Sequence, residues 1–239
     1  MKNNALVSLT NSVNNSIFVI TNATKRDGGR YICTATNKAG SYEKDFNIII
    51  LSPPKLESSY KMPNKYSKKG QKEVLKNMPI ELFCPFSGDP LPQYIWMKDG
   101  NILDPNTNSF IVMSNGGKHL KLKHTKAQDA GKYICIAKNE VGEARHEYDV
   151  DVLVPPSITS EYASSLSLRE RESLTLNCNT TGNPSPFVIW LKDGIEVEAN
   201  DDELKFSFNN MNLEITDIKS YHSGKYICIA TNLAGSTEK

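Results

Sequence analysis

Apolar and polar residues alternate in short stretches along the whole chain. The clearest stretches are "FVI" at 18–20, "LKL" at 120–122, "LEI" at 213–215 and "IELFC" at 80–84. A period of two is typical of a β-strand with one buried face. Turns rich in Gly and Pro separate these stretches, and no segment has a convincing amphipathic helical pattern. The pattern therefore predicts an all-β protein.

One motif follows the alternating stretches three times. Its copies are "DGGRYICTATNKAG" at 27–40, "DAGKYICIAKNEVG" at 129–142 and "HSGKYICIATNLAG" at 222–235. A catalytic motif would need its Asp, Tyr and Cys to meet. Alternation along a strand instead turns Tyr133 and Cys135 inward and leaves Asp129 at the turn. The repeat therefore indicates a structural unit and no enzyme.

The third copy departs from the motif, because His222 stands where Asp27 and Asp129 stand in the others. A neutral imidazole lacks the charge of a carboxylate, so we expect this corner to be slightly weaker at pH 7.

The five cysteines are far apart and form no CxxC pair, which argues against zinc. The motif cysteines Cys135 and Cys228 follow Cys84 and Cys178 by 51 and 50 residues, while Cys33 has no such predecessor. A tryptophan lies twelve residues after each of the two earlier cysteines, at positions 96 and 190. The order Cys, Trp, Cys thus recurs twice.

Proline pairs divide the chain. Pro53 and Pro155 each begin such a pair 20 residues after a motif cysteine. Proline cannot donate to a sheet ladder, so we expect the pairs to mark unit edges joined by short extended linkers. The predicted units are 1–52, 53–154 and 155–239, the middle one having about the 100 residues of a small sandwich.

These motifs resemble immunoglobulin-like domains, most closely the I-set type. The resemblance rests on Cys, Trp, D-x-G-x-Y-x-C and the turns "GDPLP" at 88–92 and "GNPSP" at 182–186. It implies tandem Greek-key β-sandwiches. Within that family the motif sequences are similar to those of hemicentin-type extracellular matrix proteins.

The resemblance also implies roles for individual residues. Disulfides would join Cys84 to Cys135 beneath Trp96, and Cys178 to Cys228 beneath Trp190, leaving Cys33 unpaired. Each motif tyrosine would pack in a core and bond back to the backbone as a tyrosine corner; these are Tyr31, Tyr133 and Tyr226.

The repeat spacing predicts incomplete outer units. A cysteine partner for Cys33 would fall ahead of Met1, so we expect 1–52 to be only the C-terminal half of a unit. The same spacing predicts that the unit at 155–239 lacks its final strand.

Charge and composition narrow the function classes. There are 28 Lys plus Arg against 27 Asp plus Glu. The net positive charge is therefore too small to attract nucleic acid to the chain as a whole. No apolar run is long enough to span a membrane, and the first residues lack the apolar core of a signal peptide. We expect no cofactor and no metal, since the histidines lack metal-ligand spacing and suit exposed strands or turns: His119, His124, His146 and His222.

One basic stretch, 60–76, suits a sulfated glycosaminoglycan or, more simply, a solvated first strand. Its lysines are Lys61, Lys65, Lys68, Lys69, Lys72 and Lys76. An acidic stretch at 195–203 has the opposite sign, and solvation explains it equally well.

Three sequons mark possible glycosylation sites, at Asn14, Asn22 and Asn179. Asn179 follows inward-facing Cys178, so its side chain should point to solvent, which makes it the best acceptor.

The sequence predicts a non-catalytic, extracellular array for protein-protein recognition and spacing, whose partners are other proteins, including further copies of itself. The alternatives are an intracellular muscle array resembling titin and the ectodomain of a receptor. The cysteine pairs favour an oxidising compartment without deciding between them.

Overall fold

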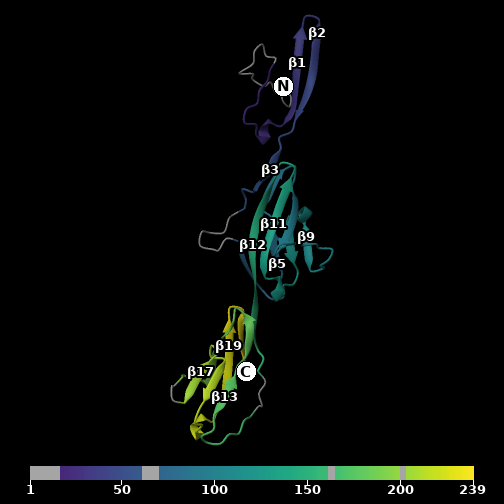
Figure 1. The fold of residues 1–239 in the computed structure, drawn as a ribbon. Coiled ribbons are helices and arrows are strands. Elements are labelled where there is room, and N and C mark those ends of the chain that lie inside the picture. The colour runs from purple at the N-terminus through teal and green to yellow at the C-terminus, as the bar shows by residue number, and fades with distance from the viewer. Residues whose placement is uncertain (1–16, 61–69, 161–164, 200–202) are drawn as a thin grey trace.

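The computed structural model describes residues 17–60, 70–160, 165–199 and 203–239. Within these ranges every helix is a three-residue 3-10 turn, and all other regular structure is β-strand. Three units follow one another along a single long axis (Figure 1). The all-β prediction is confirmed.

The middle unit is a sandwich of two sheets. One sheet pairs β10 (His119–Leu122) antiparallel with both β5 (Ile80–Phe83) and β9 (Ile111–Ser114). The other has the order β12, β11, β7, β8, with β4 added parallel to β12. Its strands are β4 (Gln71–Leu75), β7 (Gln93–Lys98), β8 (Asn101–Ile102), β11 (Gly131–Asn139) and β12 (Gly142–Ile158).

A disulfide joins the sheets of the middle unit at its centre. Cys84 is bonded to Cys135 of β11, with 5.7 Å between their Cα atoms. Trp96 is fully buried beside it, and its indole Nε1–H donates to the Gly117 carbonyl at 2.7 Å. Closing a loop of about 50 residues stabilises the folded state by about 4 kcal/mol in the chain-entropy description.

The third unit repeats this plan. A sheet of β13 (Leu174–Asn177), β18 (Asn212–Ile215) and β17 (Leu204–Ser207) faces a sheet of β16, β15, β19 and β20. Cys178 is bonded to Cys228, and Trp190 donates to the Asn210 carbonyl at 2.8 Å. The second sheet comprises β15 (Phe187–Lys192), β16 (Ile195–Glu196), β19 (Tyr226–Asn232) and β20 (Gly235–Glu238).

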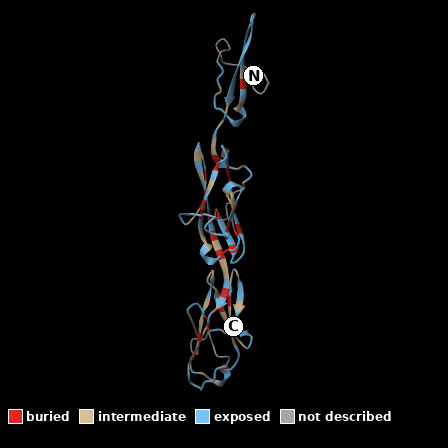
Figure 2. Ribbon diagram, turned by 90° about the vertical axis from the view of Figure 1, so that its right-hand side faces the viewer, coloured by how far each residue is buried: buried red, intermediate tan, exposed pale blue. Residues whose placement is uncertain are grey.

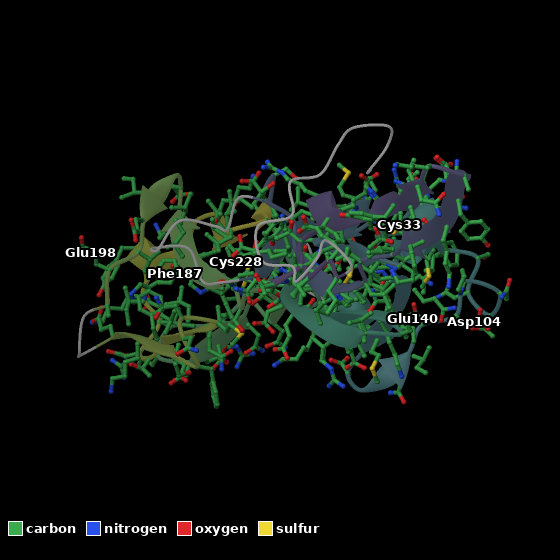
Figure 3. All side chains as sticks on the ribbon, turned by 90° about the horizontal axis from the view of Figure 1, so that it is seen from above. Cys33, Asp104, Glu140, Phe187, Glu198 and Cys228 are labelled. Carbon is green, nitrogen blue, oxygen red and sulfur yellow. A yellow bond between two sulfur atoms is a disulfide. The ribbon has the colours of Figure 1, made fainter. Side chains whose placement is uncertain are left out.

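The first unit contributes one hairpin, β1 (Gly29–Asn37) with β2 (Gly40–Ile48). Tyr31 is its buried residue and packs against the ring of Phe18 at 5.4 Å between centroids. Within the described ranges no second sheet covers this hairpin, so Cys33 of β1 is exposed and free. Figure 3 labels it well apart from Cys228.

The proline pairs lie inside strands, which corrects the prediction of linkers. β3 (Ser52–Leu56) pairs with β6 (Phe86–Asp89), and the end of β12 pairs with β14 (Thr180–Asn183). The register shifts at each pair, between Ser52 and Lys55 and between Val154 and Ser157. Such a bulge frees the prolines from donating to the ladder, so the strand continues through them.

The third unit does contain the start of its final strand, contrary to prediction. β20 pairs with β19 from Asn232–Gly235 to Ile229–Glu238. The predicted start of this strand was too late in the chain, because it was based on the spacing between the motif cysteines and the proline pairs. It begins at the glycine that closes the motif, as β2 and β12 do at Gly40 and Gly142.

Buried residues gather in the middle and third units, while the first unit is almost entirely exposed (Figure 2). The residues that the structure describes therefore form two cores, one around each disulfide.

Candidate functional site at the junctions between units

The asparagine of the repeated "AxNxxG" sequence builds a turn in each unit. The Asn139 side-chain Oδ1 accepts the backbone N–H of Val141 at 3.0 Å and of Gly142 at 3.1 Å. The Asn37 and Asn232 side chains make equivalent bonds in their own turns. An Asx turn of this kind lets the chain reverse between two strands.

In both complete units the amide of the same asparagine fastens the incoming chain. Asn139 Nδ2 donates to the Ser52 carbonyl at 2.8 Å, and Asn232 Nδ2 donates to the Val154 carbonyl at 2.9 Å. Ser52 and Val154 each precede a proline pair. One side chain thus ties a turn at the end of a unit to the strand that enters it, and we call this arrangement the asparagine clamp.

The G-x-P-x-P turn completes the asparagine clamp. Its first proline follows a cis peptide bond in both units, and its carbonyl accepts a second bond from the clamp amide. The distances are 2.9 Å from Asn139 to Pro90 and 2.8 Å from Asn232 to Pro184.

The glycine of that turn leaves room for the clamp. A Cβ on Gly88 would come within 3.0 Å of the Asn139 amide, and one on Gly182 within 2.9 Å of the Asn232 amide. Both contacts are tighter than ordinary packing, which explains glycine at the two positions.

The two junctions differ at the residue before the cis proline. Asn183 donates from Nδ2 to Asp151 Oδ1 at 2.8 Å and to the Val152 carbonyl at 2.9 Å, both in the middle unit. Asp89 has the equivalent place at the first junction. A carboxylate cannot donate to a carbonyl, and Asp89 instead pairs with exposed Lys25 at 3.3 Å.

The tyrosines of the motif lie at the corners of their units. The hydroxyls donate four residues back, Tyr31 to the Asp27 carbonyl, Tyr133 to that of Asp129 and Tyr226 to that of His222, at 2.8 to 2.9 Å. Burial, with the nearby Asp129 and Asp99 carboxylates, raises the pKa of Tyr133. The Tyr133 hydroxyl is therefore a neutral donor at physiological pH, and the bonds of all three tyrosines are structural.

His222 is buried, which corrects the expectation of an exposed histidine. Its Nδ1 accepts the Lys219 backbone N–H at 3.1 Å, as Asp129 Oδ2 accepts that of Lys126 at 2.7 Å. The neutral ring replaces the carboxylate as acceptor, so the corner keeps its bond. Its Nε2 lies 3.5 Å from Glu203, whose pKa is lowered by hydrogen bonds from Lys219 and Tyr221.

In the middle and third units, an aspartate side chain explains why the motif has glycine two residues before its tyrosine. Asp99 Oδ1 accepts the Lys132 backbone N–H at 2.9 Å, and a Cβ on Gly131 would come within 2.7 Å of that carboxylate. Asp193 meets Lys225 and Gly224 in the same way. Hydrogen bonds from the Lys98 side chain and the Lys132 backbone lower the pKa of Asp99. The pKa of Asp193 is lowered by the Lys225 backbone and then the Lys192 side chain.

The remaining predicted site residues are scattered over the surface. Asn22 and Asn179 are exposed, as are Lys72 and Lys76. Asn14 and four lysines of the basic stretch lie outside the described residues: Lys61, Lys65, Lys68 and Lys69. Within the described ranges no three His, Cys, Asp or Glu side chains gather as a metal site. Nor does any helix in those ranges have the length and apolarity needed to cross a bilayer.

Sequence reasoning missed the asparagine clamp, although its residues were in view. The Asn of "AxNxxG" occurs in all three repeats and the Gly of G-x-P-x-P in two. The signal in the sequence was that this asparagine and this glycine recur together in the same units. It did not identify the partner, because the accepting carbonyl lies almost 90 residues away in one unit and almost 80 in the other.

Disulfide-bonded β-sandwiches in series, each clamped to the strand that enters it, define a tandem domain array. The sequence profile of the immunoglobulin I-set domain matches residues 1–50 and 66–152, and that of an immunoglobulin domain matches 155–232. The chain belongs to the immunoglobulin I-set family.

The relatives of this chain include hemicentins and titin. The chain is 35% identical to hemicentin-1 of Mus musculus over 93% of its own length but only 4% of that protein. It is 27% identical to titin of Drosophila melanogaster over 91% of its length and 1% of titin. A solved structure of three titin domains, I67–I69 in an E-to-A variant, is 25% identical and superposes with a TM-score of 0.72, covering 90% of this chain and 74% of that one.

Proposed function

We propose that this chain is a non-catalytic, extracellular spacing and recognition module, whose junctions hold successive immunoglobulin domains at set angles. The observation that carries the proposal is the asparagine clamp, since one side-chain amide donates both to the incoming strand and to the cis-proline turn of the unit that the strand enters. A chain that acted only through the surfaces of its domains would not need hydrogen bonds that fix the junctions between those domains.

The second junction supports this role most strongly. β12 runs without interruption from the middle unit into the third, and Asn183 adds two bonds across the boundary. A continuous strand with side-chain bonds on its flank resists bending more than a flexible linker does. A spacer needs this property.

Extracellular placement is supported by the two disulfides and by the similarity to hemicentin-1. The rival is an intracellular muscle array resembling titin, which would use the same joints with reduced thiols. Mass spectrometry of native material without reduction distinguishes them. We expect Cys84, Cys135, Cys178 and Cys228 to be linked; free thiols at these four positions would reject the extracellular proposal.

A glycan at Asn179 follows from the same proposal. The side chain is exposed, while its backbone N–H and carbonyl are used by Ser160 and Thr159, so a glycan would disturb no structural bond. Expression through a secretory pathway should give a mass shift that glycosidase removes, and Asn179→Gln should lose that site alone.

Small-angle scattering tests the spacing role. The wild-type chain should scatter as an elongated particle with one narrow set of dimensions. Asn183→Asp should broaden that set, while Asp217→Asn, on an exposed turn that precedes the corner at the other end of β19 from Asn232, should not. Equal scattering from all three proteins would count against spacing by fixed joints.

A further inference from the structure

The only Asn-Gly sequence of the chain, Asn115–Gly116, lies in a turn of the middle unit. Glycine has no Cβ to shield its backbone nitrogen, so the amide carbon of a preceding asparagine can come close to that nitrogen. Both residues are exposed, and a Cβ on Gly116 would meet no heavy atom within 4 Å. The surroundings therefore leave space for a ring to close between the Asn115 side chain and the Gly116 nitrogen.

The Asn115 side chain differs from those of the three Asp-Gly sequences of the chain. Each of those carboxylates accepts a backbone N–H at 2.8 to 2.9 Å: Asp27 from Thr24, Asp99 from Lys132 and Asp193 from Lys225. Among the residues that the structure describes, the side chain of Asn115 has no hydrogen bond. It is therefore the one side chain before an Asx-Gly bond that can turn toward the nitrogen without breaking a bond.

The same turn carries the hydrogen-bond acceptor of the core tryptophan. Asn115, Gly116 and Gly117 all have left-handed backbones, with φ of 51°, 65° and 93°. The Gly117 carbonyl accepts the indole N–H of fully buried Trp96 at 2.7 Å. A longer backbone at Asn115 would therefore displace the only polar partner of this indole.

The third unit has the same turn without the Asn-Gly sequence. Phe208, Asn209 and Asn210 have φ of 52°, 56° and 64°, and the Asn210 carbonyl accepts the indole N–H of Trp190 at 2.8 Å. No residue of this turn is followed by glycine. The two turns match in backbone and differ in chemistry, so the third unit is an internal control.

We propose that Asn115 is a site of spontaneous deamidation, which weakens the middle unit as the protein ages. The Gly116 backbone nitrogen attacks the Asn115 side-chain carbon and forms a succinimide ring. The bond from that carbon to the side-chain nitrogen breaks, and ammonia leaves with the proton of the Gly116 amide. Water then opens the ring at either carbonyl and gives aspartate or isoaspartate, and neither step is an oxidation or a reduction.

Isoaspartate has the more damaging structure, because it adds the methylene of the side chain to the backbone of the turn. The Gly117 carbonyl is then displaced, and the buried Trp96 indole loses its acceptor. The folding equilibrium constant of the middle unit should fall about tenfold, as for one lost buried hydrogen bond, while that of the third unit should not change. No residue of the asparagine clamp takes part, so this proposal and the spacing role can fail separately.

The test incubates the full chain and a synthetic peptide of residues 111–120 at mildly alkaline pH, which promotes attack by the amide nitrogen. Peptide mapping by mass spectrometry should show that Asn115 exchanges an NH group for an oxygen in both. Enzymatic methylation should detect isoaspartate at this position and at none of the three Asp-Gly sequences of the folded chain. Asn115→Gln, whose ring would need six members, should show neither change.

A folded chain that stays unmodified while the peptide converts would overturn the proposal. Isoaspartate formed to the same extent at the Asp-Gly sequences would also overturn it.

Denaturation followed by Trp96 fluorescence in a Trp190→Phe background measures the consequence. Asn115→Asp is the matched control, because it adds the charge without the longer backbone. The aged chain should unfold at lower denaturant than the fresh chain, and fresh Asn115→Asp should unfold like the fresh chain. Equal midpoints for fresh and aged protein would refute the weakening of the middle unit.

Discussion

The two junctions of this chain use the same asparagine clamp and differ in one side chain. At the second junction Asn183 donates two hydrogen bonds back to the middle unit. At the first, Asp89 offers only acceptors and meets a lysine that is 82% exposed. With an oxygen in place of the amide nitrogen, one exposed ion pair to the preceding unit stands where the second junction has two hydrogen bonds.

If the proposed spacing role holds, this difference lets a repeat array vary its stiffness along its length. The clamp, the cis proline and the turn glycine recur, so each unit receives its incoming strand in the same way. The residue before the proline then decides whether the preceding unit is held by two hydrogen bonds or by one exposed ion pair. Angles between domains can therefore be set locally without changing any core.

The largest effect should come from removing the clamp itself. Asn232→Ala loses two bonds to carbonyls and one within the turn, and should reduce the free energy of unfolding of the third unit by about 2–3 kcal/mol. Asn139→Ala should do the same to the middle unit. Denaturation followed by Trp190 fluorescence in a Trp96→Phe background, and the reverse, measures each; a loss in only one unit would mean that the clamps are not equivalent.

Exchanging the differing residue should reverse the comparison. Asn183→Asp places a carboxylate against Asp151 and the Val152 carbonyl and should weaken the second junction by about 1–2 kcal/mol. Asp89→Asn restores a donor at the first junction and should stiffen it. Nuclear magnetic resonance order parameters for each unit report both changes, and an Asp89→Asn chain as mobile as wild type would refute the role given to this position.

Lowering the pH should destabilise the middle and third units to a similar extent. The pH dependence therefore reports the stability of the units separately from the stiffness of the junctions. Asp99 and Asp193 have lowered pKa values, for the reasons given above. A lowered folded-state pKa adds stability above the unfolded value of about 3.9, and that stability is lost as pH falls through the folded value.

The free energy of unfolding of both units should therefore decrease between pH 6 and pH 2. In Asp99→Asn, the free energy of unfolding of the middle unit alone should depend less on pH. A flattened third-unit curve in that variant would show that the units are coupled.

The smallest effect should come from the exposed ion pair at the first junction. Lys25→Ala removes a contact between solvated groups and should change stability by no more than about 0.5 kcal/mol. Relaxation measurements on the first unit should look like wild type. A marked rise in mobility would mean that Lys25 holds this junction after all.

Much of the fold could be predicted because its signals are local. Strand alternation and the corner tyrosines depend on neighbours along the chain, and the Cys, Trp, Cys order recurs at nearly the same spacing in two units. The continuity of β12 was missed because proline was taken to end a strand, whereas a bulge lets the strand pass. The start of β20 was missed because it was counted from prolines instead of from the motif glycine.

The candidate site was harder to predict because its chemistry joins distant residues. Nothing near Asn183 or Asp89 in the sequence says which carbonyl lies opposite. Only the structure shows that His222 Nδ1 accepts the backbone bond that a carboxylate accepts in the middle unit, and the slightly weaker corner stays a prediction.

Distance distributions across each junction test the central claim most directly. Spin labels at three exposed positions, Tyr42, Ile102 and Ile195, in a Cys33→Ser background, give one pair spanning each junction. The account predicts a narrow distribution between Ile102 and Ile195 and a broader one between Tyr42 and Ile102. Distributions of equal width, or a broader one across the second junction, would contradict it.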